Sequence, residues 1–134
     1  MKNIVKSISG IPEGADKVHL VYAKEELKQL DLKKDELKYA QSRFQKDKAL
    51  LVSINRYDHW VFIQVVRQDK NTGKQWEGLR NAGNDLQGII NKNRIERIHI
   101  FDSRKNKDSM LAFAEGMALG NYQFIHCLLY TSPS

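Results

Sequence analysis

Hydrophobic and polar residues follow two rhythms along this chain, and each rhythm predicts a kind of element. Apolar or alternating runs of five to eight residues predict β-strands at 3–8, 17–23, 49–54, 59–66 and 94–101. Apolar residues that recur every three or four positions predict helices at 33–46, 76–90 and 110–121, with a shorter helical turn at 24–30. This order predicts an α/β fold in which helices cover both faces of a mixed sheet of five or six strands.

Two features predict how strands are joined and buried. The four residues 55–58 are too few for a parallel crossover, so the strands on either side of them are expected to form an antiparallel hairpin. The run 49–54 is apolar throughout and predicts a strand buried on both faces. The run 94–101 is predicted to be the last strand.

Helix starts are predicted from capping residues. Thr72 and Gln75 have the spacing of a capping box, and Asp108 or Ser109 is a suitable N-cap for the last helix. Three glycines, at 78, 83 and 88, lie inside the second long helix, where each costs about 1 kcal/mol relative to alanine. We expect close approach of this helix to the sheet to offset that cost.

The same periodicity predicts the residues of the hydrophobic core. They are Leu50, Val52, Val61, Ile63, Val65, Trp76, Leu79, Leu86, Ile98, Ile100, Phe113 and Met117.

Composition and charge narrow the class of protein without identifying a function. The 134 residues amount to one domain, with a net charge of +6 in which basic and acidic residues are interleaved, as on a solvated surface. A weak nucleic-acid contact is the alternative use of this charge, with Arg104, Lys105 and Lys107 as its densest basic group. No apolar run is long enough for a membrane span or a secretory signal, which predicts a cytoplasmic protein with no membrane partner.

A search for reactive groups predicts no catalytic, cofactor-binding or metal-binding residue. The four histidines, His19, His59, His99 and His126, are scattered and lack a second ligand at helical spacing. Cys127 has no base near it in the sequence, and the acidic pairs 25–26 and 35–36 lie among lysines. The glycines match no phosphate-binding loop.

One segment near the C-terminus carries a family resemblance. Residues 115–124, Glu-Gly-Met-Ala-Leu-Gly-Asn-Tyr-Gln-Phe, closely resemble a Glu-Gly-x-x-Leu-Gly-x-Tyr-x-Phe stretch of the leucine aminopeptidase family. In that family the stretch lies between the N-terminal and catalytic domains. The order of elements over residues 15–124 is similar as well, although Gly116 and Gly120 also suit a plain packing helix.

The resemblance implies a macrodomain-like three-layer α/β/α fold for residues 1–124. It also implies a cytoplasmic, hexameric parent enzyme that removes N-terminal residues from peptides with two divalent cations, zinc or manganese. The metal ligands of that family belong to a catalytic domain that this chain lacks. We therefore expect the chain alone to be inactive, and its partners to be its own catalytic domain and further copies in a homo-oligomer.

Residues 125–134 are expected to be a non-native tail, because Cys127–Ser134 is similar to a translated sequencing adaptor. The competing function is a binding module, either a macrodomain-like binder of nucleotides or ADP-ribose or a nucleic-acid binder.

Overall fold

The structure is a computed structural model that describes residues 4–8, 14–30, 32–95, 97–119 and 126–130, with only the backbone of its first and last strands. Its elements in chain order are β1 (Ile4–Ile8), β2 (Lys17–Val21), η1 (Lys24–Gln29), α1 (Lys34–Gln45), β3 (Leu51–Asn55), β4 (Trp60–Val65), α2 (Thr72–Lys92), β5 (Arg97–Asp102), α3 (Lys107–Leu119) and β6 (His126–Tyr130).

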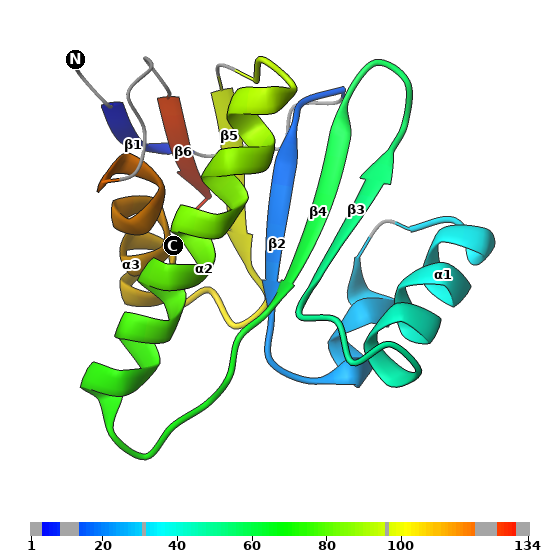
Figure 1. The fold of residues 1–134 in the computed structure, drawn as a ribbon, viewed down its shortest axis with the longest axis horizontal. Helices are drawn as coiled ribbons and strands as arrows, with labels where there is room; N and C mark the ends of the chain where they lie inside the picture. Colours follow the sequence, from blue (N-terminus) through cyan, green and yellow to red (C-terminus); the bar gives the residue numbers. More distant parts are fainter. Residues whose placement is uncertain (1–3, 9–13, 31, 96, 120–125, 131–134) are drawn as a thin grey trace.

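The strands form one mixed sheet of six, in the order β1-β6-β5-β2-β4-β3 (Figure 1). Every neighbouring pair is parallel except β3 and β4, which form the predicted antiparallel hairpin. The carboxyl ends of the five parallel strands therefore lie along one edge of the sheet.

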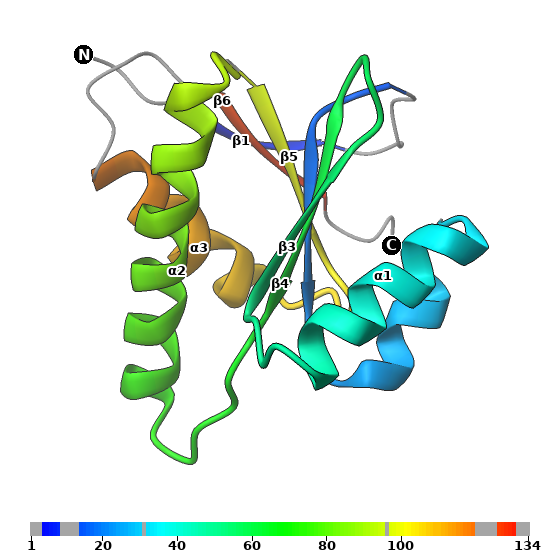
Figure 2. The same ribbon diagram turned by 45° about the vertical axis from the view of Figure 1, so that its right-hand side comes forward.

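Helices cover both faces of this sheet. Figure 2 shows α2 and α3 on one side and η1 with α1 on the other. Two apolar clusters fill the layers between them: one joins Phe62 and Ile100 to α2 and α3, and the other joins Ile63 to Leu27 of η1 and Ala40 of α1. The predicted α/β/α arrangement of three layers is confirmed.

Most of the predicted core is buried, with three exceptions. Nine of the twelve residues are at most 2% exposed, whereas Val65 and Trp76 are only half-buried and Leu50 is 39% exposed. Leu50 lies one residue before β3, and its side chain lines a cavity that is open to solvent. The prediction for Leu50 was wrong because the apolar run began two residues before the strand.

The run 49–54 is also not a strand buried on both faces. It forms β3, an edge strand in which only Val52 and Ile54 are buried. β4 has four successive buried residues, from Val61 to Gln64, and lies between β2 and β3. An apolar run indicates that a strand has buried residues. Whether that strand lies in the centre or at the edge of the sheet depends on the strand order, which the run does not show.

Both predicted N-caps are displaced to a preceding asparagine. Asn71 Oδ1 accepts a hydrogen bond from Lys74 N at 3.2 Å, so α2 is capped one residue before Thr72. Asn106 Oδ1 accepts from Ser109 N at 3.1 Å at the start of α3. Asn, Ser, Thr and Asp are similar caps, so neighbouring candidates cannot be ranked from the sequence.

Two glycines allow α2 and α3 to cross at close range. A Cβ atom added to Gly83 of α2 would overlap the carbonyl oxygen of Phe113, and one added to Gly116 of α3 would overlap the carbonyl oxygen of Arg80. The close approach is thus between two helices, not between a helix and the sheet as predicted. Among the described residues outside the helix's own adjacent backbone, no atom lies within 4 Å of a Cβ added at Gly78 or Gly88, so no close contact requires a glycine there.

One strand was not predicted. β6 lies between β1 and β5 and pairs in parallel with both. It occupies five of the ten residues that the sequence assigns to a non-native tail, so this segment is placed inside the sheet. The domain boundary at residue 124 stays a prediction.

Candidate functional site

The carboxyl edge of the sheet has a topological switch point between β2 and β5. These strands are parallel neighbours, but the chain leaves β2 through η1 and α1 on one face and leaves β5 through α3 on the other. A crevice between such diverging connections is the usual ligand site of an open α/β sheet. The side chains at this point therefore decide whether the fold can bind a ligand there.

Tyr22 and Asp102 meet at this point although they are 80 residues apart. The Tyr22 hydroxyl donates to Asp102 Oδ2 at 2.5 Å, and it lies 2.9 Å from Ser109 Oγ at the start of α3. Tyr22 has a single hydroxyl proton, so Ser109 supplies the proton of the second bond. Burial raises the pKa of the Tyr22 hydroxyl above its ordinary value, and the hydrogen bond to Asp102 raises it further.

Asp102 also fixes the loop that follows β5. Its Oδ1 atom accepts from the backbone N–H groups of Arg104 at 2.8 Å and Asn106 at 3.3 Å. Burial raises the pKa of the Asp102 carboxyl, while the bonds from Tyr22 and from these amides oppose the rise. Converging loop amides are what a fold uses to hold a phosphate or another anion, and here a side chain of the same chain occupies them.

Arg104 lies across the Tyr22 ring. Its guanidinium carbon is 4.4 Å from the ring centroid, a cation–π contact, and its Nε donates to Glu26 Oε2 at 3.0 Å. Glu26 Oε1 accepts from Ser103 Oγ at 2.5 Å and from Tyr22 N at 2.7 Å. Burial would raise the pKa of Glu26, but these three hydrogen bonds outweigh it and hold the pKa below its ordinary value.

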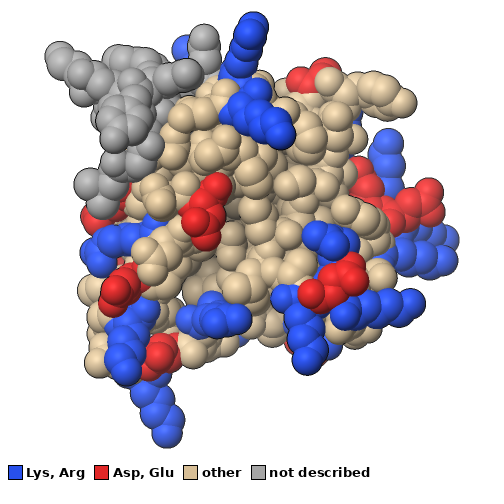
Figure 3. Space-filling model, in the orientation of Figure 1, with Lys and Arg blue, Asp and Glu red and all other residues tan. Residues whose placement is uncertain are grey.

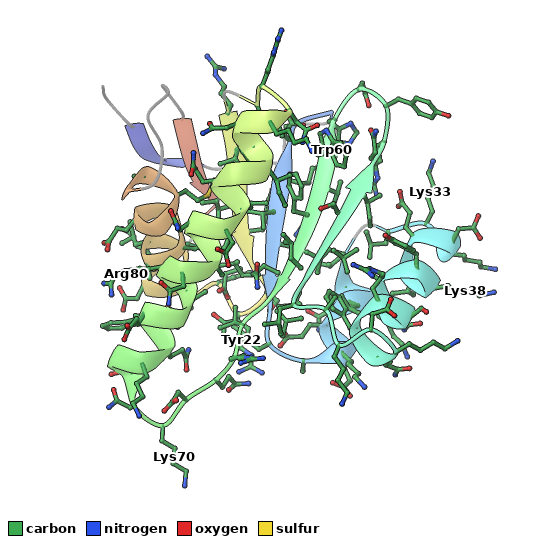
Figure 4. The ribbon with its side chains drawn as sticks, in the orientation of Figure 1. Tyr22, Lys33, Lys38, Trp60, Lys70 and Arg80 are labelled. Atoms are coloured by element: carbon green, nitrogen blue, oxygen red, sulfur yellow. The ribbon has the colours of Figure 1, made fainter. Side chains whose placement is uncertain are left out.

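The switch-point network, defined as Tyr22, Glu26, Asp102, Ser103, Arg104 and Ser109, is therefore closed on itself. Figure 4 labels Tyr22 at this end of the sheet. The network's hydrogen bonds hold the loop after β5 in place and connect that loop to Glu26 of η1. The two loop amides that converge at Asp102 are occupied by its carboxylate and are not free to bind an external anion.

The histidines do not gather into a site. His19 of β2 stacks on Phe101 of β5 with ring centroids 5.0 Å apart, and burial lowers its pKa to about 4, with Lys17 and Arg56 adding to the effect. His59 Nδ1 lies 2.6 Å from Asp58 Oδ1 on the hairpin. Within the described residues, no group of three or more His, Cys, Asp or Glu side chains could hold a metal ion. Cys127 and His126 belong to β6, of which only the backbone is described.

The charged surface agrees with the interleaved sequence pattern. Figure 3 shows basic and acidic side chains mixed around the rim of one face. Of the densest basic group, Arg104 is engaged in the switch-point network, whereas Lys105 and Lys107 are exposed.

Sequence reasoning missed the switch-point network because its members come from three separate segments. A usable signal was present: polar residues lie at the carboxyl ends of two neighbouring strands, at 22 and at 102–104. This signal becomes readable only once β2 and β5 are known to be adjacent.

Comparison with known proteins supports the fold. No protein-family model and no curated protein sequence matches the chain. Among solved structures, it is similar to a tomato leucine aminopeptidase carrying the mutation K354E, with 8% identity and a TM-score of 0.63. That match covers 98% of this chain and 34% of the aminopeptidase chain, so this chain spans about a third of that protein.

A second solved structure matches at its full length. The macrodomain of Thermus aquaticus DarG has 9% identity and a TM-score of 0.57, over 98% of this chain and 100% of the macrodomain. At these identities both matches show the fold alone, and this chain has a macrodomain-like fold. No helix in the described part of the chain is long and apolar enough to cross a membrane.

Proposed function

We propose that this chain is the non-catalytic N-terminal domain of a leucine-aminopeptidase-like metallopeptidase and that it supports assembly of that enzyme's oligomer. Two observations support the family: the resemblance of residues 115–124 to a stretch of these enzymes, and the fold similarity to a leucine aminopeptidase over 98% of this chain. In this proposal, two-metal hydrolysis with zinc or manganese belongs to a catalytic domain elsewhere in the parent protein.

The closed switch-point network is the observation that favours a structural role over ligand binding. A nucleotide phosphate at the carboxyl ends of β2 and β5 would need free loop amides. The Asp102 carboxylate accepts from those of Arg104 and Asn106, and Arg104 itself covers Tyr22. A phosphate would have to displace a carboxylate that is covalently part of the chain.

A calorimetric titration with ADP-ribose tests this choice. We expect no saturable binding at millimolar ligand, because the amides are occupied. Binding with a dissociation constant in the micromolar range would contradict the structural role and favour a nucleotide-binding module.

An activity and assembly experiment tests the family. The 134-residue protein should not cleave leucine p-nitroanilide with added manganese or zinc, whereas a longer protein carrying a catalytic domain after residue 124 should do so. Removal of residues 1–124 from the longer protein should reduce the number of subunits per oligomer, obtained by dividing the mass from light scattering by the mass of the shortened subunit. Chelator-sensitive turnover by the short chain at a comparable rate would contradict the proposal.

The second candidate is a macrodomain-like module that binds nucleotides or ADP-ribose. It is favoured by the match to a macrodomain along that domain's whole length, which shows that this fold also occurs as a complete unit. The other binding module, a nucleic-acid binder, is tested by titration with duplex DNA at two salt concentrations, because phosphate-driven binding weakens steeply with salt.

A further inference from the structure

A cavity of about 390 Å³ opens beside the switch-point network, between the carboxyl ends of β2 and β4 and the layer formed by η1 and α1. Apolar side chains make up most of its walls: Val21, Leu27, Phe44, Leu50 and Val65. This volume and this lining are typical of small-molecule sites, in which a few polar groups orient an apolar ligand. The cavity also explains why Leu50 is exposed, since one wall is open to solvent.

Three cations surround the cavity: Lys24, Lys48 and Arg67. None of the described residues that line it is acidic. Glu26 and Asp47, which are close in sequence to the two lysines, are paired instead with Arg104 and Arg43. The rim cations form no ion pair with any described carboxylate.

The wall that carries Lys48 and Leu50 is held in place by backbone contacts. Ala49 N donates to Arg43 O at 3.1 Å, and Leu50 O accepts from Val65 N at 2.8 Å and from Gln64 Nε2 at 3.0 Å. Lys48 itself has a φ of 51°, a left-handed conformation that is unusual for a residue with a side chain. The cavity is therefore formed before a ligand arrives, which lowers the ordering cost of binding.

We propose that this cavity binds an amphipathic organic anion, with its apolar body against the walls and its carboxylate among Lys24, Lys48 and Arg67. Apolar walls alone would accept any apolar ligand, and it is the unpaired cations that select an anion. The carboxylate can belong to a free aliphatic or aromatic acid or to the carboxyl terminus of an apolar peptide. This inference is independent of the proposed function, since the cavity adjoins the closed network at Tyr22 but does not require it to open.

Amide chemical shifts in NMR titrations test the proposal, with 2-naphthoate and decanoate as probes and uncharged 2-naphthalenemethanol as the matched neutral ligand. We expect saturable shifts at residues 21–24, 48–50 and 65–67 with the anions, and at least fivefold weaker binding of the alcohol. The variant K48Q/R67Q should weaken the anions at least fivefold and leave the alcohol unchanged.

A control variant removes the same charge elsewhere. Lys38 and Lys70, labelled in Figure 4, are exposed and do not line the cavity, so K38Q/K70Q should bind the anions as the unmodified protein does. An apolar tripeptide with a free carboxyl terminus and its amidated form distinguish the two sources. Tighter binding of the free-acid peptide than of 2-naphthoate assigns a peptide terminus, and the reverse order assigns a small acid.

The proposal is overturned by any of three results: no saturable shift with either anion at millimolar concentration, equal affinity for acid and alcohol, or equal weakening by the two double variants. ADP-ribose binding that K48Q/R67Q leaves unchanged would overturn the proposed function but not this inference.

Discussion

At the scale of single residues, the Tyr22 hydroxyl connects the end of β2 to Asp102 at the end of β5 and to Ser109 in α3. Asp102 is 6% exposed, so its carboxyl group depends on partners within the chain. Removing one partner of a buried hydrogen bond costs more than the bond contributes, because the remaining group stays desolvated.

We predict that Tyr22→Phe lowers the free energy of unfolding by about 1–3 kcal/mol, measured by urea denaturation. Tyr39→Phe is the matched control: Tyr39 is 49% exposed, and its loss of a hydroxyl should change stability by less than about 0.5 kcal/mol. Equal effects of the two variants would show that the Tyr22 hydroxyl bonds add nothing to stability.

His19 makes the fold sensitive to mild acid. Its pKa is about 4 in the folded protein and near 6.5 in an unfolded chain, because burial disfavours the charged imidazole. As the pH falls from 6.5 towards 4, the unfolded state takes up a proton before the folded state does. The contribution of His19 to stability is thus fully present above pH 6.5 and declines below it.

We predict that His19→Phe reduces the loss of unfolding free energy between pH 6.5 and 4.5 in a series of urea titrations. The variant keeps an aromatic ring against Phe101, and a smaller slope should remain because burial lowers the pKa of His99 as well. A slope identical to that of the unmodified protein would contradict the assignment.

At the scale of elements, the crossing of α2 and α3 depends on two glycines that face the partner helix. Gly83 meets the Phe113 carbonyl and Gly116 meets the Arg80 carbonyl, so the two contacts are reciprocal. The opposing atoms are backbone, which cannot move aside by changing a rotamer.

We predict that Gly83→Ala and Gly116→Ala each destabilise the fold by at least about 2 kcal/mol through overpacking. Gly78→Ala and Gly88→Ala lie in the same helix with open space around them, so they should stabilise it by up to about 1 kcal/mol. Thermal unfolding of the four variants gives the comparison, and a common sign for all four would refute the close crossing.

The sequence predicted where the helices and strands lie along the chain more accurately than it predicted which of them lie side by side in the fold. Periodicity located β2, β4, α1 and α2 because burial on one side of a strand or helix leaves a local trace. It could not show that β3 is an edge strand or that β5 lies beside β2, since sheet order depends on contacts between distant segments. The switch-point network was missed for the same reason, and β6 was missed because its residues were attributed to a non-native tail.

At the scale of the whole molecule, β6 lies inside the sheet, whereas the sequence predicts a domain that ends at residue 124. β6 pairs with β1 on one side and with β5 on the other. A chain without it loses two ladders, in which each hydrogen bond contributes about 0.5–1.5 kcal/mol.

We predict that a chain ending at residue 124 is less stable than the full chain by several kcal/mol in urea denaturation. A chain ending at Tyr130, which keeps β6, serves as the control and should unfold like the full chain. Equal stability of all three chains would support the boundary at 124 that the sequence predicts, and would show that β6 adds nothing to the fold.

The carboxylate of Asp102, the last residue of β5, also affects how the stability of the protein would respond to anions in solution. A protein whose anion site is filled from solution gains stability as that anion becomes more concentrated, by RT ln(1 + [L]/Kd). Here the anion is tethered to the amides that bind it, so its local concentration is set by the chain and does not vary with the medium. Nucleotides or phosphate would therefore not stabilise the protein by binding to these amides. The steady-state abundance of the protein would not depend on their cellular concentration in this way.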